Sequence, residues 1–364
     1  MGRSMNDLEI FDRYPATRAL GHVRLGNLPT PVESYSALAE KLGIGELWVK
    51  RDDLTGSIYG GNKVRKLEFI LADALAVGHE RVWTVGALGS HHVLATALYA
   101  REVGLEPHAL HFPQPVTAHV LEVLQALSTT QPVLTPVESK NGLPFAMAKT
   151  HIREWLSRDK NPYYIPGGGS SPLGVVGYVN AALELARQIE DGACAEPDVI
   201  YVAAGTCGTL AGLILGARLA GLRTKIVGVR VVDKVVCNAP LTAHMANKTS
   251  RLIRDAGGPE LPKICANDVT LLDDFIGEGY GKETSEGLRV MEMVERHTGL
   301  ELDPTYTAKT FAALDAHAES LADKRVLYWH TLSGADLSTR IARANIERDL
   351  PASYRELFDT PLPH

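Results

Sequence analysis

Residues 199–221 read VIYVAAGTCGTLAGLILGARLAG, and this stretch decides the fold class. Its first part, Val199–Ala203, is a short apolar run of residues that favour strands, which predicts a buried β-strand. A turn rich in glycine and threonine follows, and Leu210–Gly221 continues as an apolar helix. A buried strand that leads through a tight turn into a helix is the repeating unit of an α/β protein.

The same alternation of strands and helices extends over most of the chain. Short apolar runs bounded by Gly, Pro or polar residues predict further buried strands at Leu47–Val49, Arg81–Val85, Ala109–Phe112, Lys225–Arg230 and Arg325–His330. Apolar residues recur at helical spacing over Lys63–Val77, His91–Val103 and Gly174–Gln188. We therefore expect βαβ units and mostly parallel sheets. We expect two sheets, because the number of strands exceeds what one open sheet comfortably holds. The glycine-rich stretch Tyr163–Gly177 is the candidate hinge between two halves.

Composition excludes several classes of protein. A chain of 364 residues corresponds to about two domains at ~150 residues each. With 45% hydrophobic and 22% charged residues it is neither disordered, collagen-like nor a coiled coil. The net charge of −6 leaves no basic face for nucleic acid or an anionic membrane. The N-terminal segment lacks the apolar stretch of a secretory signal, and no apolar run is long enough to span a bilayer, so we expect a cytoplasmic protein.

The four cysteines are scattered through the second half of the chain. Cys194, Cys207, Cys237 and Cys265 have neither metal-ligand spacing nor a Cys-x-x-Cys pair. This usage is typical of reduced thiols in a cytosolic protein, and we expect no metal site.

The first segment that can carry chemistry is KRDDLTGSIYGGNKVRK, residues 50–66. A Gly-Gly-Asn turn, ending at Asn62, places Lys63 at the start of an amphipathic helix. The helix dipole, the neighbouring cations Arg65 and Lys66, and partial burial all favour the neutral amine, the nucleophilic form of lysine. The alternative is an ordinary solvated lysine in the first turn of a helix.

A second segment is VWTVGALGSHHVLATA, residues 82–97. Ser90 is suited to cap the helix that begins at His91, and a helix N-terminus beside glycines can also bind a carboxylate. His91 and His92 point about 100° apart on a helix, so a metal ion shared by both is not expected.

The turn Gly205–Thr209 is the third segment, with backbone N–H groups and threonine hydroxyls suited to a phosphate. It is no P-loop, because no Gly-Lys-Ser/Thr follows, and Cys207 breaks a Gly-x-Gly-x-x-Gly pattern. An ordinary turn, or a weak dinucleotide site, is the alternative. In the C-terminal third, Tyr280 lies between glycines, Tyr306 follows Asp-Pro, and Thr331 ends a strand. A lysine, a phosphate turn and hydroxyls at strand ends together describe a pyridoxal-phosphate site.

Taken in order, these segments resemble the D-cysteine desulfhydrase and 1-aminocyclopropane-1-carboxylate deaminase family. Its members are pyridoxal-phosphate enzymes of the tryptophan-synthase-β-like (type II) fold. The resemblance covers Arg13 to Leu337 and rests on KRDDLTG, GGNKVRKLEF, TVGALGSHH, IPGGGSSPLGVVGYVNAALELA, AAGTCGTLAGL, GEGYG and LDPTYTAK.

The resemblance implies an α/β fold of two domains, each an open, twisted, mostly parallel sheet flanked by helices. Residues 1–65 and 174–364 would form a large cofactor-binding domain and residues 66–173 a small inserted domain, with the cofactor in the cleft between them. It also implies a homodimer, and a small amino acid as substrate.

The resemblance also assigns roles to single residues. Lys63 would bind the cofactor covalently, with Asn62 and His91 beside it. The expected phosphate-binding residues are Gly205, Thr206, Cys207, Gly208 and Thr209, and Thr307 and Thr331 would contact the ring. The substrate would meet Ser90, His91, His92, Tyr280 and Tyr306. Catalysis would rest on Lys63, Ser90, Tyr280 and Tyr306.

This chain departs from the family pattern around the cofactor. His91 replaces an asparagine that normally touches the cofactor's phenolic oxygen. Cys207 stands at a usual glycine, which is tolerable if its φ is negative. The turn after His330-Thr331 reads Leu-Ser-Gly rather than Gly-Gly.

One position bears on the substrate. The deaminases have Glu directly after the tyrosine of Asp-Pro-x-Tyr, whereas this chain has Thr307. A hydroxyl there, or from Thr331, leaves the pyridine nitrogen more neutral, which suits loss of a β-leaving group better than ring opening. We therefore expect D-cysteine desulfhydrase-type β-elimination. The alternatives are 1-aminocyclopropane-1-carboxylate deamination, another amino-acid substrate, a nicotinamide-dependent oxidoreductase, or a cofactor-binding protein without turnover.

Overall fold

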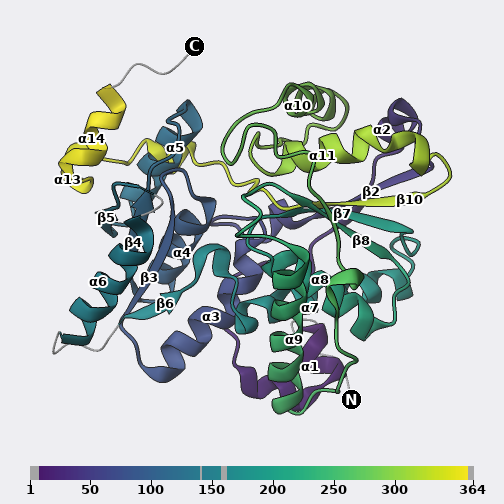
Figure 1. Ribbon diagram of the computed structural model, residues 1–364, viewed down its shortest axis with the longest axis horizontal. Helices are drawn as coiled ribbons and strands as arrows, with labels where there is room; N and C mark the ends of the chain where they lie inside the picture. The colour runs from purple at the N-terminus through teal and green to yellow at the C-terminus, as the bar shows by residue number, and fades with distance from the viewer. Residues whose placement is uncertain (1–7, 140–141, 157–161, 360–364) are drawn as a thin grey trace. The chain divides into compact units, whose positions relative to one another are not determined.

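The computed structural model describes residues 8–139, 142–156 and 162–359. The chain divides into two compact units, which Figure 1 shows as ribbons. The larger unit contains Met1–Phe69 and Ser170–Gly334, and the smaller one contains Ile70–Gly169 and Ala335–His364. Among the described residues, no helix is long and apolar enough to cross a membrane.

The larger unit is built on a six-stranded sheet with the order β1-β2-β10-β7-β8-β9. Its strands are β1 (Val32–Ser34), β2 (Glu46–Arg51), β7 (Val199–Ala204), β8 (Lys225–Arg230), β9 (Thr270–Leu272) and β10 (Arg325–His330). All neighbouring pairs run parallel except β1 with β2. The carboxyl ends of β2, β7 and β10, where ligands bind in open parallel sheets, therefore lie at one edge.

Helices cover both faces of this sheet (Figure 1). Leu327 and Trp329 pack in one apolar cluster with α7 (Pro172–Glu190), α8 (Gly208–Ala220) and α9 (Ala239–Asp255). The alternate residues Val326 and Tyr328 pack in a second cluster with α2 (Ser36–Leu42), α10 (Ser285–Thr298) and α11 (Thr307–Ala316). Successive side chains of a strand point to opposite faces, so a strand buried on both sides reads as the continuous apolar run seen in the sequence.

The smaller unit has a four-stranded parallel sheet with the order β5-β4-β3-β6. Its strands and helices are β3 (Arg81–Ala87), α4 (His91–Glu102), β4 (Glu106–Phe112), α5 (Ala118–Ser128), β5 (Val133–Pro136), α6 (Leu143–Leu156) and β6 (Tyr163–Ile165). The remaining helices of the chain are α1 (Glu9–Arg13), α3 (Lys63–Val77), α12 (Ser338–Ile341), α13 (Ile346–Asp349) and α14 (Ala352–Asp359).

The expected α/β class and all six expected strands are confirmed, and the helix expected at residues 63–77 has those bounds. The sequence missed β1, β5, β6 and β9. These strands have three or four residues each, and all four lie at a sheet edge. A strand this short buries too few residues to show a clear apolar pattern.

The division into units differs from the expected domains. The inserted unit begins at Ile70 and ends at Gly169, rather than at residues 66 and 173. Residues 335–364 group with it, whereas they were expected in the larger domain. The reason is packing within the smaller unit: the Tyr354 hydroxyl lies 3.2 Å from Nδ1 of buried His111, and Arg340 donates to the Thr129 hydroxyl at 3.3 Å.

Candidate active site

Lys63 is the first residue of α3 in the larger unit, and its side chain is partly buried. Its Nζ donates to Asn62 Oδ1 at 2.6 Å. Burial lowers the pKa of Lys63 to about 8, although the charge of Asp303 acts in the opposite direction. Near neutral pH a usable fraction of the side chain is therefore the neutral amine that attacks a carbonyl carbon.

This pKa gives a pH-dependent prediction for the protein freed of cofactor. Because only the neutral amine reacts, the rate at which Lys63 condenses with added pyridoxal phosphate should rise through a midpoint near pH 8. Stopped-flow absorbance over a pH series measures this rate. A rate that keeps rising to the ordinary lysine pKa of 10.5 would contradict a buried, perturbed Lys63.

The turn before Lys63 needs its glycines. Gly61 has a φ of +83°, and a Cβ there would lie 2.8 Å from the Thr331 carbonyl oxygen. The next residue, Asn62, donates from its backbone N–H to the same carbonyl at 3.2 Å. Its side-chain amide donates to the Thr209 hydroxyl at 3.1 Å. Asn62 thus ties the lysine turn to the end of β10 and to the Gly205–Thr209 turn.

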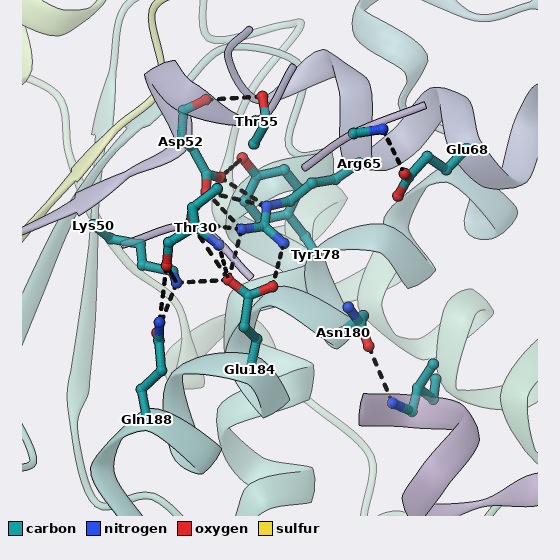
Figure 2. Close-up of polar contacts among 12 residues, drawn as sticks. Thr30, Lys50, Asp52, Thr55, Arg65, Glu68, Tyr178, Asn180, Glu184 and Gln188 are labelled. Atoms are coloured by element: carbon teal, nitrogen blue, oxygen red, sulfur yellow. Dashed lines mark hydrogen bonds and ion pairs between the residues drawn. The ribbon is translucent and has the colours of Figure 1, made fainter. Parts of the chain in front are cut away.

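A buried ionic network holds α3 in place (Figure 2). Figure 2 shows the Arg65 guanidinium between the carboxylates of Asp52 and Glu184, to which it donates at 2.7 and 2.8 Å. Lys50 donates to Glu184 at 2.6 Å, and the Tyr178 hydroxyl donates to Asp52 at 2.6 Å. These side chains come from α3, β2, α7 and the turn after β2, so the network joins the helix that carries Lys63 to the sheet and to α7.

The network is balanced in charge, and that balance depends on pH. Burial alone would raise the pKa of Glu184, but Arg65 and Lys50 lower it to about 2 from its ordinary 4.5. The folded state therefore binds this proton less readily than the unfolded chain does. Its contribution to stability is complete above about pH 4.5 and is lost as the pH falls toward 2.

Arg65→Met should strongly destabilise the protein, because it leaves the two buried carboxylates of the network with a single cation, Lys50. Removing one partner of a buried ion pair typically costs ~3–5 kcal/mol. The free energy of unfolding from urea denaturation measures this loss. Arg296→Met is the matched control, since its pair with Glu292 is exposed on α10 and worth less than ~1 kcal/mol. Equal losses in both variants would show that the network does not hold α3.

The Gly205–Thr209 turn connects β7 to α8. Cys207 is the N-cap residue of α8 and has a φ of +65°. The condition under which a cysteine is tolerated here without strain, a negative φ, is therefore not met: the chain adopts a left-handed conformation without a glycine, at a cost on the order of 1–2 kcal/mol. One N–H group of the turn is used internally, because Gly208 donates to the Thr206 carbonyl at 2.8 Å. Backbone strain of this kind often occurs at ligand-binding turns.

Two buried side chains line this turn at Gly208. A Cβ on Gly208 would overlap the Ser170 side chain and lie 3.1 Å from Lys66 Nζ. The Ser170 hydroxyl is in turn hydrogen-bonded to the Thr206 hydroxyl at 2.7 Å. Burial and the nearby charge of Lys63 lower the pKa of Lys66 well below its usual range. A bound phosphate would favour the charged form of Lys66, so the turn, Ser170 and Lys66 together suit a phosphate group.

The sequence alone did not assign Lys66 and Ser170 to this site. Lys66 was read only as a neighbouring cation, although its i+3 spacing from Lys63 places both lysines on one side of α3. Ser170 follows the run Gly167–Gly169, which gave only a hinge signal.

Gly208→Leu should sharply lower the affinity for the cofactor, since the new side chain must displace Ser170 or Lys66 from the phosphate turn. Losing two of the charge-assisted hydrogen bonds, at ~1.5–3 kcal/mol each, would weaken binding by more than about 100-fold. Fluorescence titration of the protein with pyridoxal phosphate measures this affinity. Gly221→Ala is a control for backbone strain alone, because Gly221 lies at the other end of α8 with a φ of +74° that strains an alanine, whereas no other atom lies within 4 Å of an added Cβ. An unchanged affinity in Gly208→Leu would refute the assignment.

Tyr280 and Tyr306 form a partly buried pair. Their hydroxyl oxygens lie 2.8 Å apart and their rings meet edge to face. Tyr306 is the residue before α11, and its ring reaches Gly205, where a Cβ would lie 3.4 Å from Cε1. Burial raises the pKa of both phenols, that of Tyr306 well above the usual value. Near neutral pH both therefore keep their protons, which makes the pair a proton donor rather than a base.

Asp303 organises the start of α11. Its carboxylate accepts hydrogen bonds from the N–H groups of Thr305, Tyr306 and Thr307. The Thr307 hydroxyl donates to the same carboxylate at 2.7 Å and accepts from the Asp303 N–H. The hydroxyl proton of Thr307 is thus donated to Asp303, while its oxygen keeps one lone pair, and the predicted contact of Thr307 with the pyridine ring stays a prediction. Thr331 directly follows β10, and its predicted contact with the pyridine ring stays a prediction.

The smaller unit contains the Ser90-His91-His92 segment. Ser90 caps α4, accepting a hydrogen bond from the Val93 N–H at 3.3 Å, as expected. The His91 Nε2 lies 3.0 Å from the His119 Nε2 on α5. The buried His92 ring has its Nε2 2.8 Å from the Thr84 hydroxyl of β3. The ring is thus held in the core of the unit, and the substrate-binding role of His92 stays a prediction.

The larger unit therefore brings together Lys63, Asn62, the Gly205–Thr209 turn, Tyr306 and Tyr280. A lysine with a lowered pKa beside a phosphate-binding turn fits pyridoxal phosphate, whose aldehyde and phosphate need those two groups. Among the described residues, no group of three or more His, Cys, Asp or Glu side chains is placed to hold a metal ion.

Comparison with known proteins agrees with this site. A family model described as pyridoxal-phosphate dependent enzyme matches residues 23–331. D-cysteine desulfhydrase of Klebsiella pneumoniae (strain 342) is 33% identical over 337 residues, which cover 89% of this chain and 95% of the relative. The crystal structure of a homologue of 1-aminocyclopropane-1-carboxylate (ACC) deaminase superposes with a TM-score of 0.74 and 30% identity, covering 90% of this chain and 99% of that one.

A more distant structure shares the fold alone. Processed threonine deaminase isoform 2 from Solanum lycopersicum is 16% identical, with a TM-score of 0.58 over 94% of this chain and 89% of that one. The family match spans the lysine turn, the phosphate turn and Tyr306. This chain belongs to the family of pyridoxal-phosphate-dependent enzymes.

Proposed function

We propose that the protein is a lyase that eliminates the β-thiol of D-cysteine, with water consumed and pyruvate, ammonia and sulfide released. The observation that carries the proposal is its 33% identity to a D-cysteine desulfhydrase over nearly the whole of both chains. Lys63, with its pKa of about 8 at the start of α3, supplies a group able to accept the α-proton.

Each group of the site then has one task. Pyridoxal phosphate, when bound, supplies the electron sink for the charge left at the substrate Cα. Lys63 accepts the α-proton because part of its amine is deprotonated near pH 7, whereas the phenols of Tyr280 and Tyr306 stay protonated and cannot act as bases. The Tyr306 hydroxyl, hydrogen-bonded to Tyr280, donates a proton to the departing sulfur. Ser90 and the first N–H groups of α4 receive the substrate carboxylate, the role that the sequence predicts.

Thr307 bears on the choice of substrate mainly through what it lacks, because its hydroxyl proton goes to Asp303. What remains is the absence of a carboxylate directly after Tyr306, because Thr307 stands where the deaminases have glutamate. This difference favours elimination over ring opening.

A specific observation favours a second candidate function. The structural neighbour with a TM-score of 0.74 is described as a homologue of ACC deaminase. Opening of the cyclopropane ring to 2-oxobutanoate would use the same Lys63 and Tyr306. A different amino-acid substrate for the same cofactor is the remaining alternative.

A substrate panel separates these candidates. The purified protein is incubated with D-cysteine, L-cysteine, D-serine, β-chloro-D-alanine and 1-aminocyclopropane-1-carboxylate, and keto acid and sulfide are measured. We expect equal amounts of pyruvate and sulfide from D-cysteine, with the highest kcat/KM of the panel. A higher kcat/KM for the cyclopropane substrate would identify a deaminase instead.

Two further properties complete the proposal. The protein would act in the cytoplasm, where its four free cysteines stay reduced. It would also form a homodimer. Light scattering of the purified protein measures the second property.

A further inference from the structure

Two thiols that the proposed reaction does not use meet at the phosphate turn. Cys207 is the N-cap residue of α8, and Cys237 precedes the N-cap residue of α9. The Cys207 Sγ donates to the carbonyl oxygen of Val236, the residue directly before Cys237, at 3.6 Å. This contact places the Cys207 thiol beside Cys237. Both side chains are buried, and neither is in a disulfide.

The two thiols have unlike surroundings. Hydrogen bonds from the Cys237 thiol, the Thr242 hydroxyl and the Asn238 N–H lower the pKa of Cys207 below its usual value, against the effect of burial. The hydrogen bond to Cys207, and burial, raise the pKa of Cys237. The Cys207 thiol therefore loses its proton more readily than the Cys237 thiol does. This is the arrangement in which the thiolate reacts with an oxidant and the neighbouring thiol then resolves the product.

We propose that Cys207 and Cys237 are a redox modification site that closes to a reversible disulfide on exposure to a hydroperoxide. The Cys207 sulfur attacks the peroxide oxygen, the O–O bond breaks, and hydroxide leaves, which oxidises Cys207 to a sulfenic acid. The Cys237 sulfur then attacks the Cys207 sulfur, and the sulfenic oxygen leaves as water. One peroxide is reduced for each disulfide formed, and a small dithiol restores both thiols.

The disulfide would act on the phosphate turn. A disulfide requires the two sulfur atoms to approach to about 2.0 Å, closer than hydrogen-bonded thiols lie. Cys207 already has a left-handed backbone conformation, and its neighbour Gly208 has no space for further movement toward Ser170. Pulling Cys207 toward the loop between β8 and α9 would therefore distort the phosphate turn. This consequence, unlike the disulfide itself, rests on the proposed cofactor site.

The test is peptide mapping of the oxidised holoprotein. Trypsin leaves Cys207 on Gln188–Arg218 together with Cys194, and leaves Cys237 on Val235–Lys248. The experiment therefore uses full-length protein carrying Cys194→Ser, so that a link between these peptides reports Cys207 alone. After treatment with hydrogen peroxide and alkylation of free thiols, we expect the two peptides to be linked, and dithiothreitol to separate them. The exposed Cys265 lies on a third peptide and measures general oxidation.

Matched variants distinguish the partners. Cys237→Ser should stop at the sulfenic acid of Cys207, which dimedone traps, and Cys207→Ser should leave Cys237 free for alkylation. Oxidation of Cys265 without a Cys207–Cys237 link would overturn the proposal. The proposal would also be overturned if peroxide treatment protected Cys237 from alkylation as strongly in the Cys207→Ser variant as in the protein that has Cys207.

A second readout tests the effect on the turn. Cofactor retained after oxidation and desalting should fall to a small fraction of that in the reduced protein, and should recover when dithiothreitol and pyridoxal phosphate are added. Full retention in the disulfide form would overturn the distortion of the phosphate turn. If the untreated protein binds no pyridoxal phosphate, the proposed function fails, whereas the peptide map still decides the disulfide.

Discussion

Lys63→Ala is expected to abolish turnover and to remove the visible absorbance that the covalently bound cofactor gives the protein. The variant lacks both the amine that attaches the cofactor and the group that accepts the α-proton. Removing a general base by itself typically costs ~10²–10⁴-fold in rate. Because Asn62, Thr209 and the phosphate turn are unchanged, added pyridoxal phosphate should still bind without a covalent bond. Absorbance spectra and assays for keto acid and sulfide measure these effects.

Lys66→Ala is the control for this prediction, because Lys66 is a second buried lysine on the same side of α3. It should weaken binding of the cofactor by loss of a phosphate contact and yet keep the absorbance. Borohydride reduction followed by mass spectrometry locates the modified lysine in the wild type. A reduced adduct on Lys66 instead of Lys63 would reverse the assignment of the two lysines.

Tyr306→Phe should lower kcat by ~10²–10⁴-fold and leave cofactor absorbance intact. The substitution removes one hydroxyl from the partly buried pair and keeps the ring that lies against Gly205. Since the raised pKa of Tyr306 keeps it protonated, the loss should concern donation of a proton to the leaving group. A substrate with a better leaving group, such as β-chloro-D-alanine, should therefore recover much of the rate. Steady-state kinetics on both substrates measures this difference.

Tyr280→Phe is the matched variant, because it removes the partner hydroxyl 2.8 Å away and leaves that of Tyr306. We expect a smaller loss in kcat than for Tyr306→Phe, together with a rise in KM from a less well closed pocket. A larger loss in kcat for Tyr280→Phe would exchange the roles of the two tyrosines. Equal small losses in both variants would exclude the pair from proton transfer.

Local sequence patterns were sufficient to predict the strands and helices that carry the residues of the candidate site. The run Val199–Ala203, its glycine-rich turn and the helix after it depend on neighbouring residues only, and the structure has them at the expected place. Lys63 was found for the same reason, since a Gly-Gly-Asn turn before an amphipathic helix is a local signal. The short strands at the sheet edges were missed because their apolar pattern covers only three or four residues.

The partners of each side chain depended on tertiary structure. Asp52, Arg65 and Glu184 are far apart in the sequence, and only packing of α7 against α3 and β2 shows that they form one buried network. The partners of Thr307 and His92, here Asp303 and Thr84, were not predicted, because a hydroxyl or an imidazole binds whichever partner the fold brings near.

The phosphate turn shows the division most clearly. The sequence by itself determined that a glycine-rich turn joins a buried strand to a helix, because backbone freedom and apolar periodicity depend only on consecutive residues. Only the tertiary structure decided that Ser170 and Lys66 line that turn and that Cys207 meets Cys237 beside it. Such contacts join residues distant along the chain, and they exist because burial of the apolar faces of α7, α8 and α9 in one core brings those segments together.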